Sequence, residues 1–387
     1  MRRGAVVLAL GTAQTLAWGS SFYLPAVLAA SMAPDLGVTV PTLYALLSMA
    51  LMVSAFGGPL AGRLIDRYGG RPVLMATSGV FAAGLLALAL AQGLLTLALA
   101  WLLLGAAMGF GLYDAAFAAL VRLYGREARG AITGITLLGG LASTVGWPLT
   151  AWAESHLGWR GACAAWAAAH LLVALPLNAL LPRVAAPAAT PVAPASDAAP
   201  ATPSPVAPRH LALLLAAVFA LLSIVSTGVA THLPALLQAG GATRAAAVAT
   251  AALVGPAQVA ARLLEMGLLK RLSPLLSARC AALGHPVGAA LMLALGPLGA
   301  LPFAVMHGLG NGLLTIVRGT LPLALFGSAG YGARQGWLTL PARVLGALSP
   351  WAFGLGMAHW GPGVLWLSAA LGLSAFACLL SMRLPRG

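Results

Sequence analysis

Charged residues are scarce in this chain: only 7% of its 387 residues are Asp, Glu, Lys or Arg, and just 7 residues are acidic. So few polar groups cannot cover the surface of a water-soluble protein. Hydrophobic residues make up 60% of the chain, and its mean hydropathy is +0.95. The composition therefore indicates a protein embedded in a lipid bilayer, which one helix of about 20 apolar residues can cross.

Cysteine is also rare. Cys163, Cys280 and Cys378 each lie within an apolar run, and their spacing does not match a metal site. We expect all three to be small buried hydrophobic side chains. We find no clustered nucleophile and base of the kind that an enzyme needs, and we expect neither a metal nor a cofactor.

A net charge of +14 can indicate a nucleic-acid-binding protein. Here the arginines stand in short loops, without a basic helix face or interleaved aromatic residues, so we expect no nucleic-acid partner. Lys and Arg are typically retained on the cytoplasmic side of a membrane. With a cytoplasmic N-terminus, sixteen of the 21 Lys and Arg fall in cytoplasmic segments, and only Arg160 and Arg244 fall on the other side. We therefore expect both termini in the cytoplasm.

The apolar runs predict twelve membrane-spanning helices, an all-α integral membrane fold. We place them at residues 5–30, 41–61, 73–91, 95–120, 131–152, 160–181, 211–232, 245–268, 279–297, 299–325, 337–358 and 363–382. The segment between the sixth and seventh spans is rich in Pro, Ala, Ser and Thr, a composition that predicts disorder. We expect an N-terminal bundle (1–182), a disordered cytoplasmic linker (183–210) and a C-terminal bundle (211–387).

A dense group of charges follows the second span and has the pattern Gly-x-x-x-Asp-Arg-x-Gly-x-Arg. It comprises Gly62, Asp66, Arg67, Gly69 and Arg71. The glycines allow a tight turn, and the aspartate can sit at the positive end of a helix. At this position the pattern resembles the loop signature between helices 2 and 3 of the major facilitator superfamily of secondary transporters.

The two halves of the chain also repeat each other at an offset of about 200 residues. Gly58-Pro59 matches Gly255-Pro256, and Pro148 matches Pro350. The resemblance to the superfamily implies two pseudo-symmetric six-helix bundles in parallel relation. Two further segments are similar to a bacterial branch of the superfamily in which some members are described as arsenite-efflux permeases. They are Gly255-Pro256-Ala257-Gln258-Val259 and Arg318-Gly319-Thr320-Leu321-Pro322-Leu323.

Ionisable side chains inside a bilayer are costly and normally face a cavity or a partner. Asp114 and Arg318 lie at similar depths in spans that correspond by the repeat, and the resemblance implies that both spans line a central cavity. Two interpretations remain open. The two residues can form an ion pair that responds to protons or substrate. Alternatively, they form a static pair, or Asp114 reaches toward Arg122 in the loop.

Three further features concern the membrane interior. Arg262 and Glu265 are three residues apart on one predicted helix, so they can pair locally, and Arg262 can also reach the cavity. Arg343 is likewise a candidate for the substrate or proton pathway, and it can instead pair with Asp66 or with its loop. Three arginines against two carboxylates suit an anionic substrate, since guanidinium offers a planar fork of donors.

Polar side chains at mid-depth complete the predicted pathway. Gln14, Gln258 and Asn311 are expected to face the cavity, together with Trp18. His232 and His307 are expected to be core or interfacial histidines, with no second histidine at metal spacing near either.

We therefore expect a proton-coupled secondary transporter in a bacterial inner membrane, acting as a monomer. It would move a small solute, such as an organic anion, by alternating access. The alternatives are an efflux permease for metalloids or drug-like compounds, and a membrane sensor that no longer transports. Uptake and efflux share this architecture.

Overall fold

The computed structural model describes residues 2–125, 128–183, 209–267, 273–326 and 331–383, and every regular element in these ranges is a helix. Helices suit an apolar sequence because each satisfies its own backbone hydrogen bonds where no water is available. The first half contains α1 (Arg3–Ser20), α2 (Pro25–Asp35), α3 (Val40–Tyr68), α4 (Gly70–Ala89), α5 (Leu94–Gly111), α6 (Tyr113–Tyr124), α7 (Ala128–Gly139), α8 (Ala142–Ala169) and α9 (Leu175–Ala179). The second half contains α10 (Arg209–Ala239), α11 (Arg244–Ala252), α12 (Val254–Gly267), α13 (Pro274–Leu295), α14 (Ala300–Phe326), α15 (Tyr331–Trp360) and α16 (Val364–Leu380).

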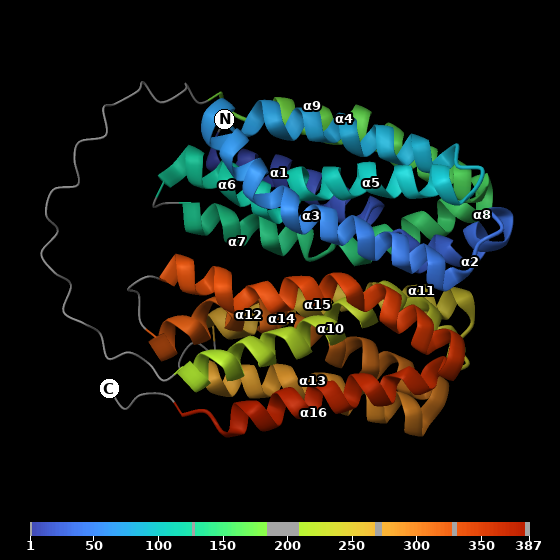
Figure 1. The fold of residues 1–387 in the computed structure, drawn as a ribbon. Coiled ribbons are helices and arrows are strands. Elements are labelled where there is room, and N and C mark those ends of the chain that lie inside the picture. Colours follow the sequence, from blue (N-terminus) through green and yellow to red (C-terminus); the bar gives the residue numbers. More distant parts are fainter. Residues whose placement is uncertain (1, 126–127, 184–208, 268–272, 327–330, 384–387) are drawn as a thin grey trace, which may run out of the picture.

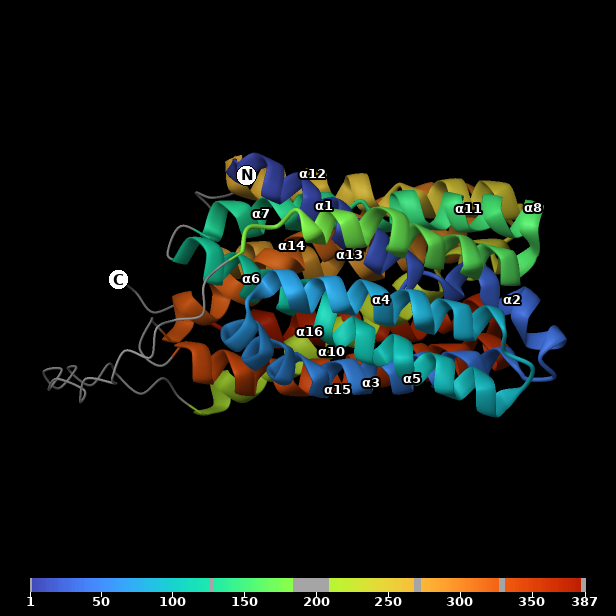
Figure 2. The same ribbon diagram turned by 90° about the horizontal axis from the view of Figure 1, so that it is seen from above.

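The two halves of the chain lie side by side as two layers of roughly parallel helix axes (Figure 1). Helix α1 begins and α16 ends at the left of this view, where α9 ends and α10 begins as well. Seen from above, α3 overlies α15 along one edge, and α8 lies near α11 along the other (Figure 2). Helix α3 packs on α15, and α8 packs on α11 and α12. These packed pairs form the boundary between the halves.

Within the described residues, nine helical stretches are long and apolar enough to cross a membrane. Three of them are much longer than the others: 130–179 with 50 residues, 274–326 with 53 and 337–380 with 44. Each contains one glycine with a left-handed backbone: Gly158 (φ 68°), Gly296 (φ 55°) and Gly361 (φ 52°). Such a conformation interrupts a helix and is readily available only to glycine. Each long stretch therefore changes direction at a glycine turn.

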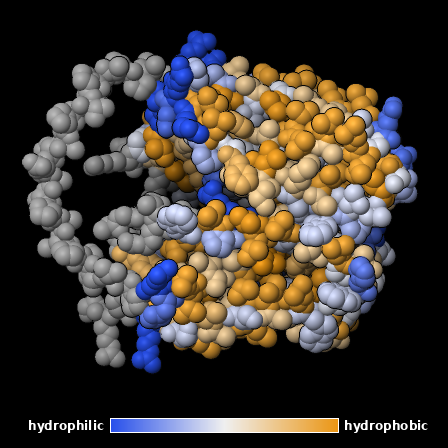
Figure 3. Space-filling view, viewed as in Figure 1, coloured by the Kyte–Doolittle hydropathy of each residue, from blue (hydrophilic) through white to orange (hydrophobic). Residues whose placement is uncertain are grey.

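The outer surface is mainly apolar. Figure 3 shows hydrophobic side chains over the middle of this face and hydrophilic ones gathered at its two ends. Leu172, Leu298 and Trp366 are among the large apolar residues with most of their surface exposed. Lipid contact explains this exposure. It also corrects one expectation: Cys163 is buried, but Cys280 is exposed and Cys378 is half-buried, because an apolar residue may face lipid as well as the core.

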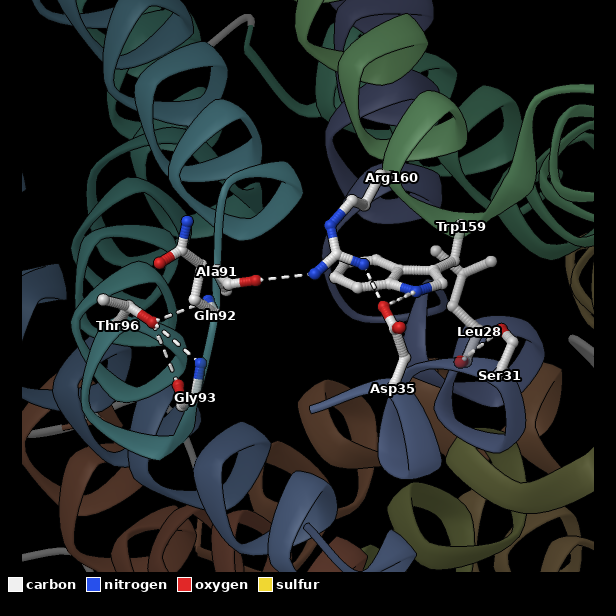
Figure 4. A network of polar contacts seen from close by, with 9 residues as sticks. All are labelled: Leu28, Ser31, Asp35, Ala91, Gln92, Gly93, Thr96, Trp159 and Arg160. Carbon is white, nitrogen blue, oxygen red and sulfur yellow. Dashed lines mark hydrogen bonds and ion pairs between the residues drawn. The ribbon is translucent and has the colours of Figure 1, made fainter. Parts of the chain in front are cut away.

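A polar network ties the first half together at the end away from the termini (Figure 4). Arg160, in α8, donates to the carboxylate of Asp35 and, at 2.9 Å, to the carbonyl of Ala91. Trp159 donates to the same carboxylate at 3.0 Å, and the Arg160 guanidinium lies 4.1 Å from the Trp159 ring centroid. One arginine therefore joins the end of α2, α8 and the loop between α4 and α5.

Candidate functional site

A cavity of about 350 Å³ lies between the two halves. Helices α1, α3, α5 and α6 line it from the first half, and α10, α14 and α15 from the second. Figure 3 shows a hollow between the layers with hydrophilic atoms inside it. The described lining residues are Trp18, Phe22, Leu51, Ser54, Ala55, Met108, Gly109, Leu112, Tyr113, Asp114, Ser223, Thr227, Arg318, Ala342, Arg343, Gly346 and Ala347. The volume is sufficient for a small organic solute.

A break in one helix places Asp114 in this cavity. Helix α5 ends at Gly111, Leu112 is extended (φ −82°, ψ −165°), and α6 begins at Tyr113. The break frees the Gly111 carbonyl, and the Gln14 amide donates to that carbonyl at 2.6 Å. Asp114 thus lies in the first turn of α6, where the helix dipole stabilises a carboxylate. The sequence predicted one continuous span here, because no proline marks the break.

The charged residues of the cavity are Asp114, Arg318 and Arg343. Asp114 and Arg318 share the cavity, and Arg343 lies near Asp114, with 3.9 Å between its Nη1 and the Asp114 Oδ2. This distance is too long for a hydrogen bond. Both side chains keep half or more of their surface exposed, 65% for Asp114 and 50% for Arg343. The pair is therefore loose and open to competition from another anion.

Aromatic side chains form part of the cavity wall. The Trp18 ring lies 5.5 Å from Phe22 and 5.2 Å from Tyr113, measured between ring centroids. The Trp18 Nε1 is buried and has no hydrogen-bond partner among the described residues. Trp18 was predicted to lie here, whereas Phe22 and Tyr113 were missed because a single aromatic residue in an apolar run carries no periodic signal.

The cavity is sealed on the side away from the termini by aromatic and backbone contacts between the halves. Tyr44 of α3 packs on His232 of α10, with 3.7 Å between ring centroids, and donates to the Thr231 carbonyl at 3.1 Å. The Trp351 backbone N–H donates to Ser48 at 3.2 Å. On each of α3, α10 and α15, these residues lie three or more residues beyond the cavity lining, farther from the termini.

An ion pair between Arg244 of α11 and the buried Glu154 of α8 reinforces the seal. Thr144 adds a hydrogen bond of 2.7 Å to the Ala252 carbonyl. Arg160 and Arg244, the two basic residues predicted on this side, therefore each have a carboxylate partner. The cavity lies on the termini side of a closed gate.

The comparisons with known proteins agree with this geometry. The model of the Major Facilitator Superfamily matches residues 10–305. The chain belongs to this superfamily. Its fold is similar to the crystal structure of a bacterial homolog of the human lysosomal transporter Spinster, in an inward-facing and occupied conformation. That match has a TM-score of 0.67 at 16% identity and covers 98% of this chain and 94% of the other. No curated protein sequence matches the chain.

Membership of the Major Facilitator Superfamily makes this protein a secondary transporter of small molecules with several membrane-spanning helices, not an enzyme. The site is consistent with this. Within the described ranges, no group of three or more His, Cys, Asp or Glu is placed to hold a metal ion. The cavity contains a loose ion pair, a second arginine and several aromatic side chains, a combination that can bind a small solute.

The superfamily loop signature lies at the end of α3 and start of α4. Gly69 has φ 87° and ends α3, a conformation that glycine adopts readily. Asp66 and Arg67 are exposed, Gly62 and Arg71 are half-buried, and the Arg67 guanidinium lies 5.2 Å from the Tyr68 ring centroid. Arg343, a candidate pathway residue that could also have paired with Asp66 or its loop, lines the cavity near Asp114.

The three mid-depth amides lie elsewhere than expected. None of Gln14, Gln258 and Asn311 is among the described residues that line the central cavity. Gln14 bonds to Gly111 inside the first half, Gln258 accepts from Arg262 at 3.4 Å, and Asn311 bonds to His307 at 2.9 Å. An amide has donors and acceptors, so buried backbone and side-chain partners satisfy it better than an open wall.

His307 is fully buried, as expected for a core histidine, and a second histidine lies beside it. His285, which the sequence places 22 residues earlier, lies beside it with 3.2 Å between their Nδ1 atoms. The two histidines come from adjacent helices α13 and α14, and sequence spacing cannot reveal such a pair. His232, by contrast, lies at the boundary between the halves, as an interfacial histidine.

Arg262 is buried and crosses from α12 to the first half. It donates to the Thr136 carbonyl of α7 at 2.6 Å. Glu265 instead accepts from Ser277 of α13, and no ion pair joins Arg262 to Glu265 among the described side chains. The predicted local pair is wrong, since neighbouring helices on opposite sides draw the two residues apart. Arg262 is therefore a contact between the halves and does not line the cavity.

Proposed function

We propose that this protein is a proton-coupled transporter of a small organic anion that works by alternating access. The observation that carries the proposal is the composition of the cavity: two guanidinium groups and one carboxylate, with an aromatic wall. A bound carboxylate or phosphate-like group competes with Asp114 for Arg343, and the planar fork of Arg318 adds a second donor set. Protonation of Asp114 would release Arg343 for the incoming anion.

The membrane topology is part of the same proposal. If each of the three long stretches with a glycine turn crosses the bilayer twice, the chain has twelve passages and both termini lie on one side. We place that side in the cytoplasm of a bacterium, because most arginines gather there. The cavity then faces the cytoplasm. We take the monomer as the transporting unit, since one chain supplies both walls.

A ligand screen tests whether the substrate is an organic anion. The purified protein is heated with organic anions, metalloid oxyacids and common drugs, and a ligand that binds the folded state raises its Tm. We expect organic anions to give the largest shifts. In Arg318→Gln and Arg343→Gln, we expect the affinity to fall about 10- to 100-fold, since a charge-assisted hydrogen bond contributes about 1.5–3 kcal/mol.

The matched control is Arg63→Gln, which removes an exposed arginine that does not line the cavity. It should bind the same anion as tightly as the unmodified chain. If the unmodified chain and the three variants bound the anion equally tightly, Arg318 and Arg343 would have no role in recognising it. Binding of drugs or metalloids in place of anions would favour an efflux permease, and binding without any flux would favour a sensor. None of the three cysteines lines the cavity, so a metalloid would need oxygen-based recognition.

We also propose that the loop signature holds the cytoplasmic side closed when the cavity opens to the other side. Asp66→Asn is expected to leave the Tm nearly unchanged, because Asp66 is exposed, but to lower flux several-fold by weakening that closed state. Flux into proteoliposomes and thermal unfolding, measured on the same preparation, test both parts. Full transport activity of Asp66→Asn in vesicles would show that Asp66 has no role in the transport cycle.

A further inference from the structure

A second, much smaller cavity of about 10 Å³ lies inside the first half, behind the helix break that precedes Asp114. Among its polar and almost completely buried lining residues are Gln14 (2% exposed), His170 (1%) and Asn178 (5%). They come from α1, from a π-helical turn at His170–Ala174 and from α9. We propose that this cavity binds one water molecule, which holds Gln14 against the helix break and so positions Asp114.

Each of the three side chains has one polar atom without a partner among the described residues. These atoms are the Gln14 Oε1, the His170 Nδ1 and the Asn178 Oδ1. A buried polar atom left unpaired costs about 1–3 kcal/mol. Native proteins therefore rarely leave three together, and a shared small ligand satisfies all of them.

The hydrogen bonds that the two amides already make determine which of their atoms remains unpaired. The Gln14 Nε2 donates to the Gly111 carbonyl, and the Asn178 Nδ2 donates to the Leu74 carbonyl at 3.3 Å and to Ser78 at 3.0 Å. A carbonyl oxygen only accepts, so an NH₂ group must face each carbonyl. The two unpaired atoms that a bound molecule could satisfy are consequently oxygens, which are acceptors.

The imidazole supplies the complementary donor. Its Nε2 lies 2.8 Å from the Ser20 hydroxyl, which is a shorter contact than the 3.4 Å from that hydroxyl to the Ala17 carbonyl. When Ser20 donates to Nε2, a neutral imidazole carries its proton on Nδ1. The cavity then presents two acceptors and one donor, and a single water molecule donates twice and accepts once.

Size and charge favour water over an ion. A volume of 10 Å³ corresponds to about one water-sized probe, the smallest space that holds a water. No carboxylate or other charged residue is among the described lining residues. A bare cation would therefore lose its hydration without a counter-charge, at a cost of several kcal/mol.

The position of the site links it to transport. Gln14 uses one end of its amide for the Gly111 carbonyl, which the break leaves without a helical partner. The proposed water holds the other end, so the amide cannot rotate away. Asp114 follows the break by three residues. Gln14, His170 and Asn178 are thus positioning residues for a carboxylate that they do not contact.

Radiolytic labelling with X-rays tests the site, because radicals formed from a bound water oxidise buried neighbours that bulk solvent does not reach. The reporter is Phe81, which lines the cavity, is 2% exposed and stacks on His170 with 4.7 Å between ring centroids. In the full chain in lipid nanodiscs we expect Phe81 to be oxidised, while Phe353, a fully buried residue of the other half, is not.

The variants form a matched set. His170→Gln keeps a polar atom near the position of the imidazole Nε2 but has none at the position of Nδ1. Gln14→Leu removes the amide of residue 14. Both should lower Phe81 labelling roughly tenfold, to background. His170→Asn retains an atom near the Nδ1 position and should restore the labelling. Phe353 reports on folding in every variant, and Gln14→Leu replaces His170→Gln if that variant does not fold.

An unlabelled Phe81 in the unmodified chain would overturn the proposal, as would equal labelling in all folded variants. A separate measurement concerns transport: Gln14→Leu should lower anion flux several-fold at unchanged protein yield. That consequence rests on the proposed function, whereas the labelling does not. If the unmodified chain gave no anion flux, the proposed function would be rejected. The water site would still be supported by the labelling of Phe81.

Discussion

Oxidation of a Tyr44→Cys, Gly354→Cys double variant is expected to stop transport, and a reductant is expected to restore it. The two positions lie on α3 and α15, on opposite sides of the boundary between the halves. A Cβ placed on Gly354 would lie 3.4 Å from the Cβ of Tyr44. Disulfides join Cβ atoms about 3.5–4.5 Å apart. The bond should therefore form with little movement.

The effect is expected to be complete because alternating access requires the seal to open. The disulfide would hold α3 and α15 together at the seal, beside His232, so the cavity could open only to the termini side. Binding from that side should persist, which distinguishes a locked transporter from an unfolded one. Flux and the ligand-induced shift in Tm, measured before and after oxidation, give both quantities.

Three controls make this result interpretable. Cys163, Cys280 and Cys378 are first replaced, since Cys280 is exposed and can form unwanted bonds. Each single variant, Tyr44→Cys and Gly354→Cys, is oxidised in the same way and should retain its flux. A double variant that forms the disulfide, as shown by a gel shift after proteolysis, and still transports at full rate would contradict the gate.

Asp114→Asn is expected to abolish flux driven by a pH gradient while anion exchange persists. Asn has nearly the same shape as Asp and still fits the first turn of α6, but it cannot gain or lose a proton. The variant also leaves Arg343 without its nearby carboxylate, so anion binding should be retained or tightened. Flux into proteoliposomes, with and without an imposed pH gradient, separates the coupled and uncoupled modes.

Asp114→Glu is the conservative comparison, because it keeps a carboxylate in the loose pair with Arg343. It should recover part of the gradient-driven flux. If Asp114→Asn kept the same dependence on the gradient as the unmodified chain, Asp114 would not be the proton carrier, and another group would have to couple the protons.

Composition and the loop signature were sufficient to predict the class of protein. Scarce charge and long apolar runs require helices in a bilayer, and the signature from Gly62 to Arg71 indicated the superfamily that the family match then established. Asp114 and Arg318 were predicted as cavity residues because a charge within an apolar span is costly anywhere else. Each of these conclusions depends on the chemistry of a residue and its local surroundings.

The partners of those residues could not be read in the same way. The sequence did not indicate that Arg343 lies beside Asp114, that His285 lies beside His307, or that Gln14 supports a helix break 97 residues away. Apolar helices can be rotated about their axes with little change in local energy, and only the packing of all of them selects one orientation. The sequence by itself therefore determined that the chain is an α-helical membrane transporter, and the tertiary structure decided which of its few polar groups meet.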